Sequence, residues 1–171
     1  MLLMSIKIFR VGLLWGLILG CSSGRLMAAE AGNSLNAFGP ESFEGIQTKY
    51  QGKPFMLALW SLDCPPCFKE LNNLARWKRN NPGLNLVVVA TDDYSMKAEV
   101  SQQIKAFGLE LADNWIFSEH AAVRLRYNID PYWHGELPRS YLYDRSHNST
   151  AVSGLLKDET IQQWVGVNKR L

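Results

Sequence analysis

Two cysteines separated by two residues are the side chains of this sequence best suited to chemistry. They are Cys64 and Cys67, the ends of the segment Cys64-Pro65-Pro66-Cys67. Cysteines at this spacing can close a small disulfide loop, and opening the loop yields two thiols. The chemistry to expect is thiol–disulfide exchange, in which a thiolate attacks a sulfur atom of another disulfide.

The position of the pair in the chain favours a reactive thiol. The apolar run FMLALW at 55–60 predicts a strand buried on both faces, and apolar residues at helical spacing follow the cysteines. Cys64 is then expected at a helix N-terminus, where backbone N–H groups and the helix dipole favour the thiolate. We predict that Cys64 is the exposed, attacking thiol and that Cys67 resolves the mixed disulfide.

Three neighbours of Cys64 moderate this effect. Pro65 and Pro66 lack backbone N–H groups, so two donors that could face the sulfur are missing. The carboxylate of Asp63 lies next to Cys64 in the chain and opposes a second negative charge. We therefore expect a thiolate at Cys64 that is favoured, but not strongly.

The first 31 residues predict a signal peptide. Lys7 and Arg10 precede an apolar, uncharged run at 11–20, and small and polar residues follow. Cys21, preceded by Ile-Leu-Gly, resembles the acylated cysteine of a bacterial lipobox, and this processing site is favoured. Cleavage near Ala31, after an A-x-A pattern, is the alternative. Either route exports residues 32–171 as one domain.

Both processing routes take Cys21 out of disulfide chemistry. An exported chain then keeps one pair of cysteines, Cys64 and Cys67, which suits an oxidising compartment. The periplasm is the expected location, with a lipid anchor at the membrane if Cys21 is acylated.

Composition limits the size of the domain and the kind of partner. The chain has 171 residues, of which 47% are hydrophobic, enough for one domain with a real core. The full chain carries 18 Lys and Arg against 16 Asp and Glu. Without residues 1–31 the counts become 15 and 15, because three cations and one acid lie there. A neutral body offers no electrostatic footprint for nucleic acid.

The order of the predicted elements defines a fold class. Strands are expected at 55–60, 84–90, 115–117, 139–144 and 150–154, and helices near 43–50 and at 68–80, 95–107, 119–128 and 157–169. A strand–helix–strand–helix order that ends in a hairpin and a last helix implies a mixed sheet with helices on both faces.

The residues around the cysteine pair resemble the thioredoxin superfamily, most closely its exported reductases of the TlpA/ResA type. Trp60, Cys64, Pro66, Cys67 and Glu70 match the pattern of that family. The resemblance implies a thioredoxin-like fold, in which Glu70 helps to move the proton of Cys67.

The segment LPRSYLYD at 137–144 resembles the family's second motif. There Pro138 would be the cis-proline that packs against the disulfide, and the backbone of Leu137 would pair with a substrate strand. The resemblance extends from about residue 42 to the last residue. We expect a set of substrate-binding residues around the disulfide: Leu137, Trp60, Asp63, Pro65, Pro66 and Trp133.

The sequence departs from the family pattern at three places. Asp63 replaces the tryptophan that usually precedes the first cysteine. Ala58 stands where cytoplasmic thioredoxins carry a buried aspartate. Residues 131–136 make the approach to Pro138 longer and more aromatic, and Tyr132, Trp133 and His134 are expected to line the substrate groove.

The predicted function is that of an exported thiol–disulfide oxidoreductase, favoured as a reductase of protein disulfides. Its partners would be periplasmic protein thiols and disulfides and a membrane thiol reductant that recycles it. No organic cofactor and no metal is expected, because the dithiol pair carries the electrons. The alternative is a thioredoxin-fold binding or metal-delivery module whose disulfide never cycles; the oxidase direction also stays open.

Overall fold

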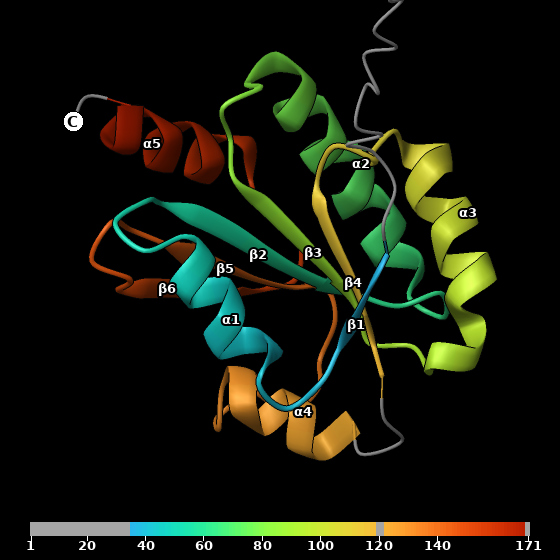
Figure 1. Ribbon diagram of the computed structural model, residues 1–171. Coiled ribbons are helices and arrows are strands. Elements are labelled where there is room, and N and C mark those ends of the chain that lie inside the picture. Colours follow the sequence, from blue (N-terminus) through green and yellow to red (C-terminus); the bar gives the residue numbers. More distant parts are fainter. Residues whose placement is uncertain (1–34, 119–121, 170–171) are drawn as a thin grey trace, which may run out of the picture.

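The computed structural model describes residues 35–118 and 122–169 of the chain. Within these ranges the strands are β1 (Asn36–Phe38), β2 (Phe55–Trp60), β3 (Leu86–Ala90), β4 (Asp113–Phe117), β5 (Arg139–Tyr143) and β6 (Ser149–Ser153). The helices are α1 (Ser42–Lys49), α2 (Pro65–Asn80), α3 (Lys97–Phe107), α4 (Ala122–Ile129) and α5 (Asp158–Lys169), and a short 3₁₀ helix spans Tyr94–Met96 (Figure 1).

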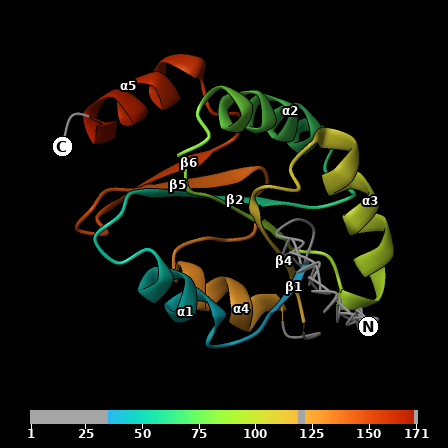
Figure 2. The ribbon, with the colours of Figure 1, turned by 45° about the horizontal axis from the view of Figure 1, so that its top comes forward.

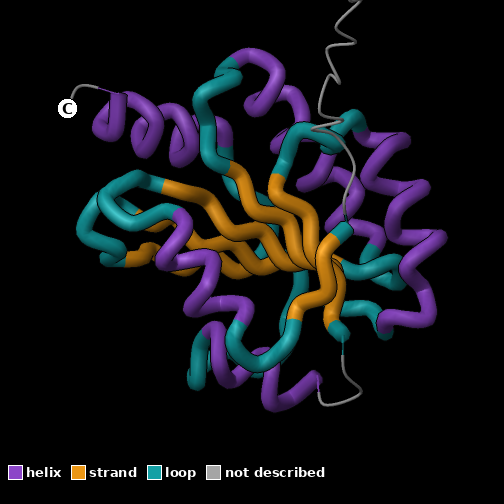
Figure 3. The backbone as a smooth tube through the Cα atoms, in the orientation of Figure 1, coloured by secondary structure: helices purple, strands orange, loops and turns teal. Residues whose placement is uncertain are grey.

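The strands form one mixed sheet in the order β1-β4-β3-β2-β5-β6. The pairs β1–β4, β4–β3 and β3–β2 are parallel, whereas β2–β5 and β5–β6 are antiparallel. The sheet lies at the centre of the molecule with helices around it (Figure 3). The predicted fold class, a mixed sheet with helices on both faces, is confirmed.

Strand β2 lies inside the sheet, between β3 and β5, and every one of its residues is buried. Side chains alternate between the two faces of a strand, so an unbroken apolar run suits a strand covered on both sides. Met56, Ala58 and Trp60 pack with residues of α2, α3 and α5 on one face. Phe55, Leu57 and Leu59 pack with α1 and α4 on the other (Figure 2).

Most predicted element boundaries differ from the structure by one to three residues. Helix α2 begins at Pro65 rather than at Phe68, and β3 begins at Leu86 rather than at Leu84. Strand β1 was not among the predicted strands; it pairs in parallel with β4. Among the described residues, none of the helices is both long enough and apolar enough to cross a membrane.

Candidate active site

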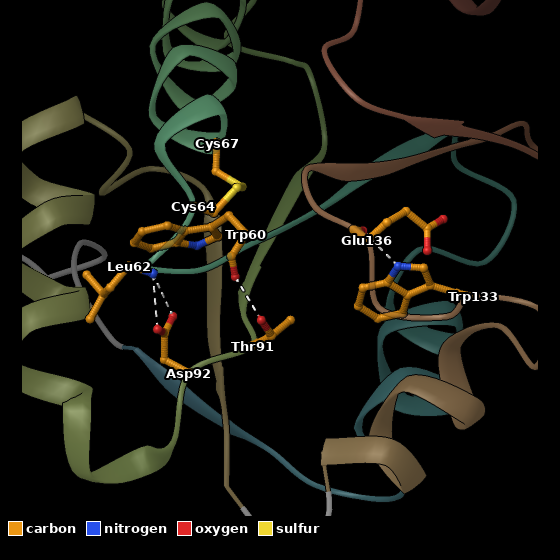
Figure 4. Close-up of a disulfide and its surroundings, with 8 residues drawn as sticks. All are labelled: Trp60, Leu62, Cys64, Cys67, Thr91, Asp92, Trp133 and Glu136. Atoms are coloured by element: carbon orange, nitrogen blue, oxygen red, sulfur yellow. Dashed lines mark hydrogen bonds between the residues drawn. A yellow bond between two sulfur atoms is a disulfide. The ribbon is translucent and has the colours of Figure 1, made fainter.

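The Cys64–Cys67 disulfide lies where the central strand passes into a helix. Strand β2 ends at Trp60, and Cys64 occupies the N-cap position of α2. The two cysteines are disulfide-bonded, with 5.2 Å between their Cα atoms (Figure 4). The Cys67 N–H donates to the Cys64 carbonyl at 2.9 Å. That bond occupies one of the few N–H donors that the two prolines leave near the Cys64 sulfur.

The disulfide reaches the surface only at Cys64. Cys64 is 7% exposed and Cys67 is fully buried. Cys64 is therefore the outer cysteine, as predicted, but it is far less exposed than expected because it packs into the core on the α2 side of the sheet. Asp63, Pro65 and Pro66, three of the predicted substrate-binding residues, are exposed around it.

Trp60 forms the base of the site. Its indole is 1% exposed and belongs to the same buried cluster as both cysteines (Figure 4). It meets the ring of Phe68 edge to face, with 6.4 Å between the centroids. In the oxidised protein this side chain supports the disulfide from the core, and its predicted contact with a substrate stays a prediction.

The predicted second motif lies next to the end of β2. Leu59 pairs with Arg139 across the antiparallel β2–β5 ladder, so Pro138 is level with Trp60. The Leu137–Pro138 peptide bond is cis. Leu137 packs against the clusters on both faces of the sheet. Within the described ranges no residue hydrogen-bonds with the backbone N–H or carbonyl of Leu137.

Glu70 lies one helical turn after Cys67 on the buried face of α2. It is 3% exposed. The Leu156 N–H donates to its Oε2 at 3.0 Å, and the Ser140 hydroxyl lies 3.5 Å from its Oε1. Burial raises the pKa of Glu70 to about 7, although these two hydrogen bonds act in the opposite direction. A carboxyl with this pKa can both take up and release a proton near neutral pH.

Two residues that the sequence interpretation did not select hold the loop before Cys64. Both carboxylate oxygens of Asp92 accept from the Leu62 N–H, at 3.0 and 3.2 Å. The Thr91 N–H and hydroxyl both donate to the Trp60 carbonyl, at 2.9 and 3.2 Å (Figure 4). Thr91 and Asp92 follow the last residue of β3, and parallel neighbouring strands end at the same edge of a sheet. The position of these two polar residues directly after a predicted strand was the sequence signal that could have identified them.

The aromatic segment before Pro138 divides between core and surface. Trp133 is 5% exposed and packs in the cluster on the α1 and α4 side of the sheet. Its indole N–H donates to the Glu136 carbonyl at 2.9 Å (Figure 4). Tyr132 and His134, on either side of it, are exposed. A direct contact of Trp133 with a substrate stays a prediction; in this structure the residue fixes the shape of the segment.

The structure bears on two further predictions only as far as its described residues extend. Among residues 35–118 and 122–169, no three His, Cys, Asp or Glu side chains gather in a way that could hold a metal ion. Residues 1–31 with Cys21, and so the predicted signal peptide and lipidation site, lie outside the described residues.

Comparison with known proteins gives structural matches but no sequence match. No protein-family model and no curated protein matches the chain. The thiol:disulfide interchange protein, a thioredoxin family protein, from Chlorobium tepidum TLS superposes with a TM-score of 0.57 and 18% identity, over 71% of this chain and 83% of that one. MTB dsbF superposes with a TM-score of 0.56 and 16% identity, over 70% and 83% of the two chains.

A third structure is a secreted Mycobacterium tuberculosis disulfide oxidoreductase described as homologous to E. coli DsbE. It superposes with a TM-score of 0.50 and 21% identity, over 70% of this chain and 85% of that one. The likenesses cover most of each chain. They confirm that this protein has the thioredoxin-like fold that its motifs predicted.

Proposed function

We propose that this protein is an exported thiol–disulfide oxidoreductase that reduces protein disulfides through its Cys64–Cys67 couple. The observation that carries the proposal is the placement of the couple. Cys64 stands at the N-cap of α2, four residues after Trp60, and Trp60 is level with Pro138 across the β2–β5 ladder. The backbone N–H and carbonyl of Leu137, just before Pro138, are unpaired within the described residues. A disulfide that only stapled the fold would need neither a cysteine at a helix N-terminus nor an unpaired Leu137 backbone close to the end of β2.

The proposed reaction moves two electrons from the dithiol to a partner. The Cys64 thiolate attacks one sulfur of the partner disulfide, forms a mixed disulfide and releases the first partner thiolate. Cys67, as a thiolate, then attacks the Cys64 sulfur, re-forms the Cys64–Cys67 disulfide and releases the second partner thiolate. Both partner sulfurs are reduced and take up protons, and a membrane thiol reductant returns two electrons to the couple.

Glu70 is proposed to take the proton of Cys67 in the second step. Cys67 is fully buried, so solvent does not reach its thiol directly. Glu70 lies three residues further along the same helix face and is the buried carboxyl of that face. Its raised pKa, caused first by burial, makes proton uptake near neutral pH favourable.

Export and the partner class are parts of the same proposal. Residues 1–31 have the pattern of a signal peptide, and one structural neighbour is described as secreted. In the periplasm the substrates would be proteins that carry disulfides, held near the membrane if Cys21 is acylated. This places the protein where disulfides form and where a dedicated reductant is needed to open them.

Reduction of insulin by dithiothreitol, with and without the protein, tests the catalytic proposal. We expect the wild type to accelerate the reaction and Cys64→Ser to abolish the acceleration. Cys67→Ser should instead accumulate a mixed disulfide through Cys64, detected by mass spectrometry. Acceleration by Cys64→Ser equal to that of the wild type would refute the mechanism.

The reduction potential of the couple decides whether the protein reduces disulfides or oxidises thiols. It also distinguishes both roles from a binding module whose disulfide is only structural. A value of about −270 mV, measured against glutathione or dithiothreitol buffers, supports a reductase, and one of about −120 mV marks an oxidant of thiols. A couple below about −300 mV that exchanges slowly would favour a binding module with a structural disulfide.

A further inference from the structure

One arginine side chain joins the two ends of the segment that leads to Pro138. Arg139 follows Pro138 directly, and its side chain is 13% exposed. Its Nη2 donates to the Asp130 carboxylate at 3.0 Å, and its Nη1 donates to the Glu136 carboxylate at 3.2 Å. Asp130 and Glu136 stand at the start and near the end of the segment 130–138. The guanidinium therefore bridges both ends of that segment.

The same guanidinium is tied to the sheet. Its Nη1 donates to the Ser153 hydroxyl of β6 at 2.6 Å, and its Nε donates to the Tyr141 hydroxyl of β5 at 3.1 Å. The Tyr141 hydroxyl donates in turn to Asp130, and the Ser153 hydroxyl donates to Glu136, both at 2.9 Å. Each carboxylate is thus held by the arginine and by a hydroxyl, which fixes the segment against the two strands.

The backbone of the segment is ordered by further hydrogen bonds. The Tyr132 N–H donates to Asp130 at 2.9 Å, and the Trp133 indole donates to the Glu136 carbonyl at 2.9 Å (Figure 4). At its far end the Gly154 N–H donates to the Pro138 carbonyl at 2.8 Å. Leu137 lies between these fixed points, and its own backbone groups bond with no residue of the described ranges.

The hydrogen bonds of this network favour the charged forms of its two acids, Asp130 and Glu136. Burial acts to raise the pKa of Asp130, but the hydrogen bonds from Tyr132, Tyr141 and Arg139 outweigh it and lower the pKa. For Glu136, too, burial is outweighed by hydrogen bonds, including that of Ser153, and by the charge of Arg139, so its pKa is lowered. Both acids are therefore ionised at neutral pH, where the bridge is fully charged.

We propose that Arg139 is a positioning residue for protein substrates: it holds the segment 130–138 so that the unpaired backbone of Leu137 meets the extended strand that carries a partner disulfide. This inference rests on the proposed function. Arginine suits the task because its planar, five-donor fork reaches four acceptors at once, whereas lysine presents one point charge. The residue acts through Leu137 and does not itself touch the sulfur atoms.

A comparison of two substrates separates this role from a merely structural one. A protein disulfide uses both the sulfur of Cys64 and the Leu137 backbone, whereas a small disulfide such as bis(2-hydroxyethyl) disulfide uses the sulfur alone. For Arg139→Lys we expect kcat/KM for the reduction of insulin, with dithiothreitol recycling the protein, to fall about tenfold. Most of this loss should appear as a higher KM. The rate with the small disulfide should stay within about twofold, and the reduction potential should not move.

Arg145→Lys is the matched control at the other end of the β5–β6 hairpin. Arg145 makes a hydrogen bond to the Asn168 carbonyl at 3.2 Å. This variant should retain both activities. If Arg139→Lys does not fold, Asp130→Asn is the second variant: it keeps an acceptor for the Tyr132 N–H but removes the charge and the oxygen that accepts from Arg139 and Tyr141. It should show the same selective loss in smaller measure.

The outcomes distinguish this inference from the proposed function. Equal losses on both substrates, or no loss on insulin, would overturn the positioning role while the wild type remains active. A wild type that reduces neither substrate would overturn the proposed function itself. A selective loss on insulin in Arg139→Lys, with both activities intact in Arg145→Lys, supports the inference.

Discussion

The buried carboxyl of Glu70 should make the stability of the oxidised protein depend on pH around neutrality. Its folded-state pKa is raised from 4.5 to about 7, chiefly by burial. A carboxyl whose pKa rises on folding binds its proton more tightly in the folded state. The stabilisation linked to that proton is complete below about pH 4.5, decreases as the pH rises through about 7, and is absent above that.

The size of the effect follows from the two pKa values. A rise from 4.5 to about 7 corresponds to roughly 3 kcal/mol, at about 1.36 kcal/mol for each pKa unit. Glutamine has nearly the shape of the protonated acid. Its carbonyl can accept from the Leu156 N–H while its amide donates to the Ser140 hydroxyl, so both contacts survive. Glu70→Gln should therefore be nearly neutral at about pH 4 and stabilising by roughly 3 kcal/mol at about pH 8.

Urea unfolding of the oxidised wild type and of Glu70→Gln at both pH values measures this difference. Thermal unfolding across the same range is a second readout. Glu44→Gln is the matched control, because Glu44 lies exposed on α1 and should give no such pH dependence. A Glu70→Gln variant whose stability runs parallel to the wild type between pH 4 and 8 would refute the argument that burial raises this pKa.

Two further predictions concern the support of the site. Asp92→Ala removes the acceptor of the Leu62 N–H, so we expect a loss of about 1 kcal/mol in stability and faster exchange of that amide with deuterium. Asp92→Asn keeps one acceptor oxygen and should recover most of the protection of the Leu62 amide against exchange. Equal exchange in the wild type, Asp92→Ala and Asp92→Asn would show that Asp92 does not hold this amide. Leu74→Ala opens a cavity between α2 and the sheet, and we expect a loss of about 2–5 kcal/mol in urea unfolding. Leu111→Ala, at an exposed position, should cost less than about 0.5 kcal/mol, and equal costs for the two variants would show that Leu74 is not a packed core residue.

The local patterns that predicted the fold are those in which burial dictates residue type. The run at 55–60 required cover on both faces, and β2 is buried along its whole length. The helix after Cys64 followed from leucine spacing and from proline at its first positions, which suits a helix start. Boundaries were less certain, because the ends of an element depend on neighbours that are distant in the sequence.

The features that the sequence did not predict arise from contacts between distant segments. Asp92 binds an amide 30 residues away, and Leu156 donates to Glu70 across 86 residues. Nothing local to Glu70 distinguishes a buried carboxyl from a solvated charge on a helix face, since its burial depends on where β5 and the segment before α5 are placed. The partners of Arg139 lie only 2 to 14 residues away, but which of them it reaches depends on how the segment 130–138 folds back onto β5 and β6.

The small residue in the middle of β2 explains why the acid of this site comes from a helix. Ala58 pairs directly with Ser140 in the antiparallel β2–β5 ladder, and paired side chains point to the same face of a sheet. On that face Ser140 meets the carboxylate of Glu70, and Ala58 packs in the cluster that contains Cys67. A second carboxylate at position 58 would stand beside that of Glu70 in the core, where two like charges oppose each other. Ala58 leaves this space to Glu70, which lies three residues after Cys67 on the buried face of the same helix.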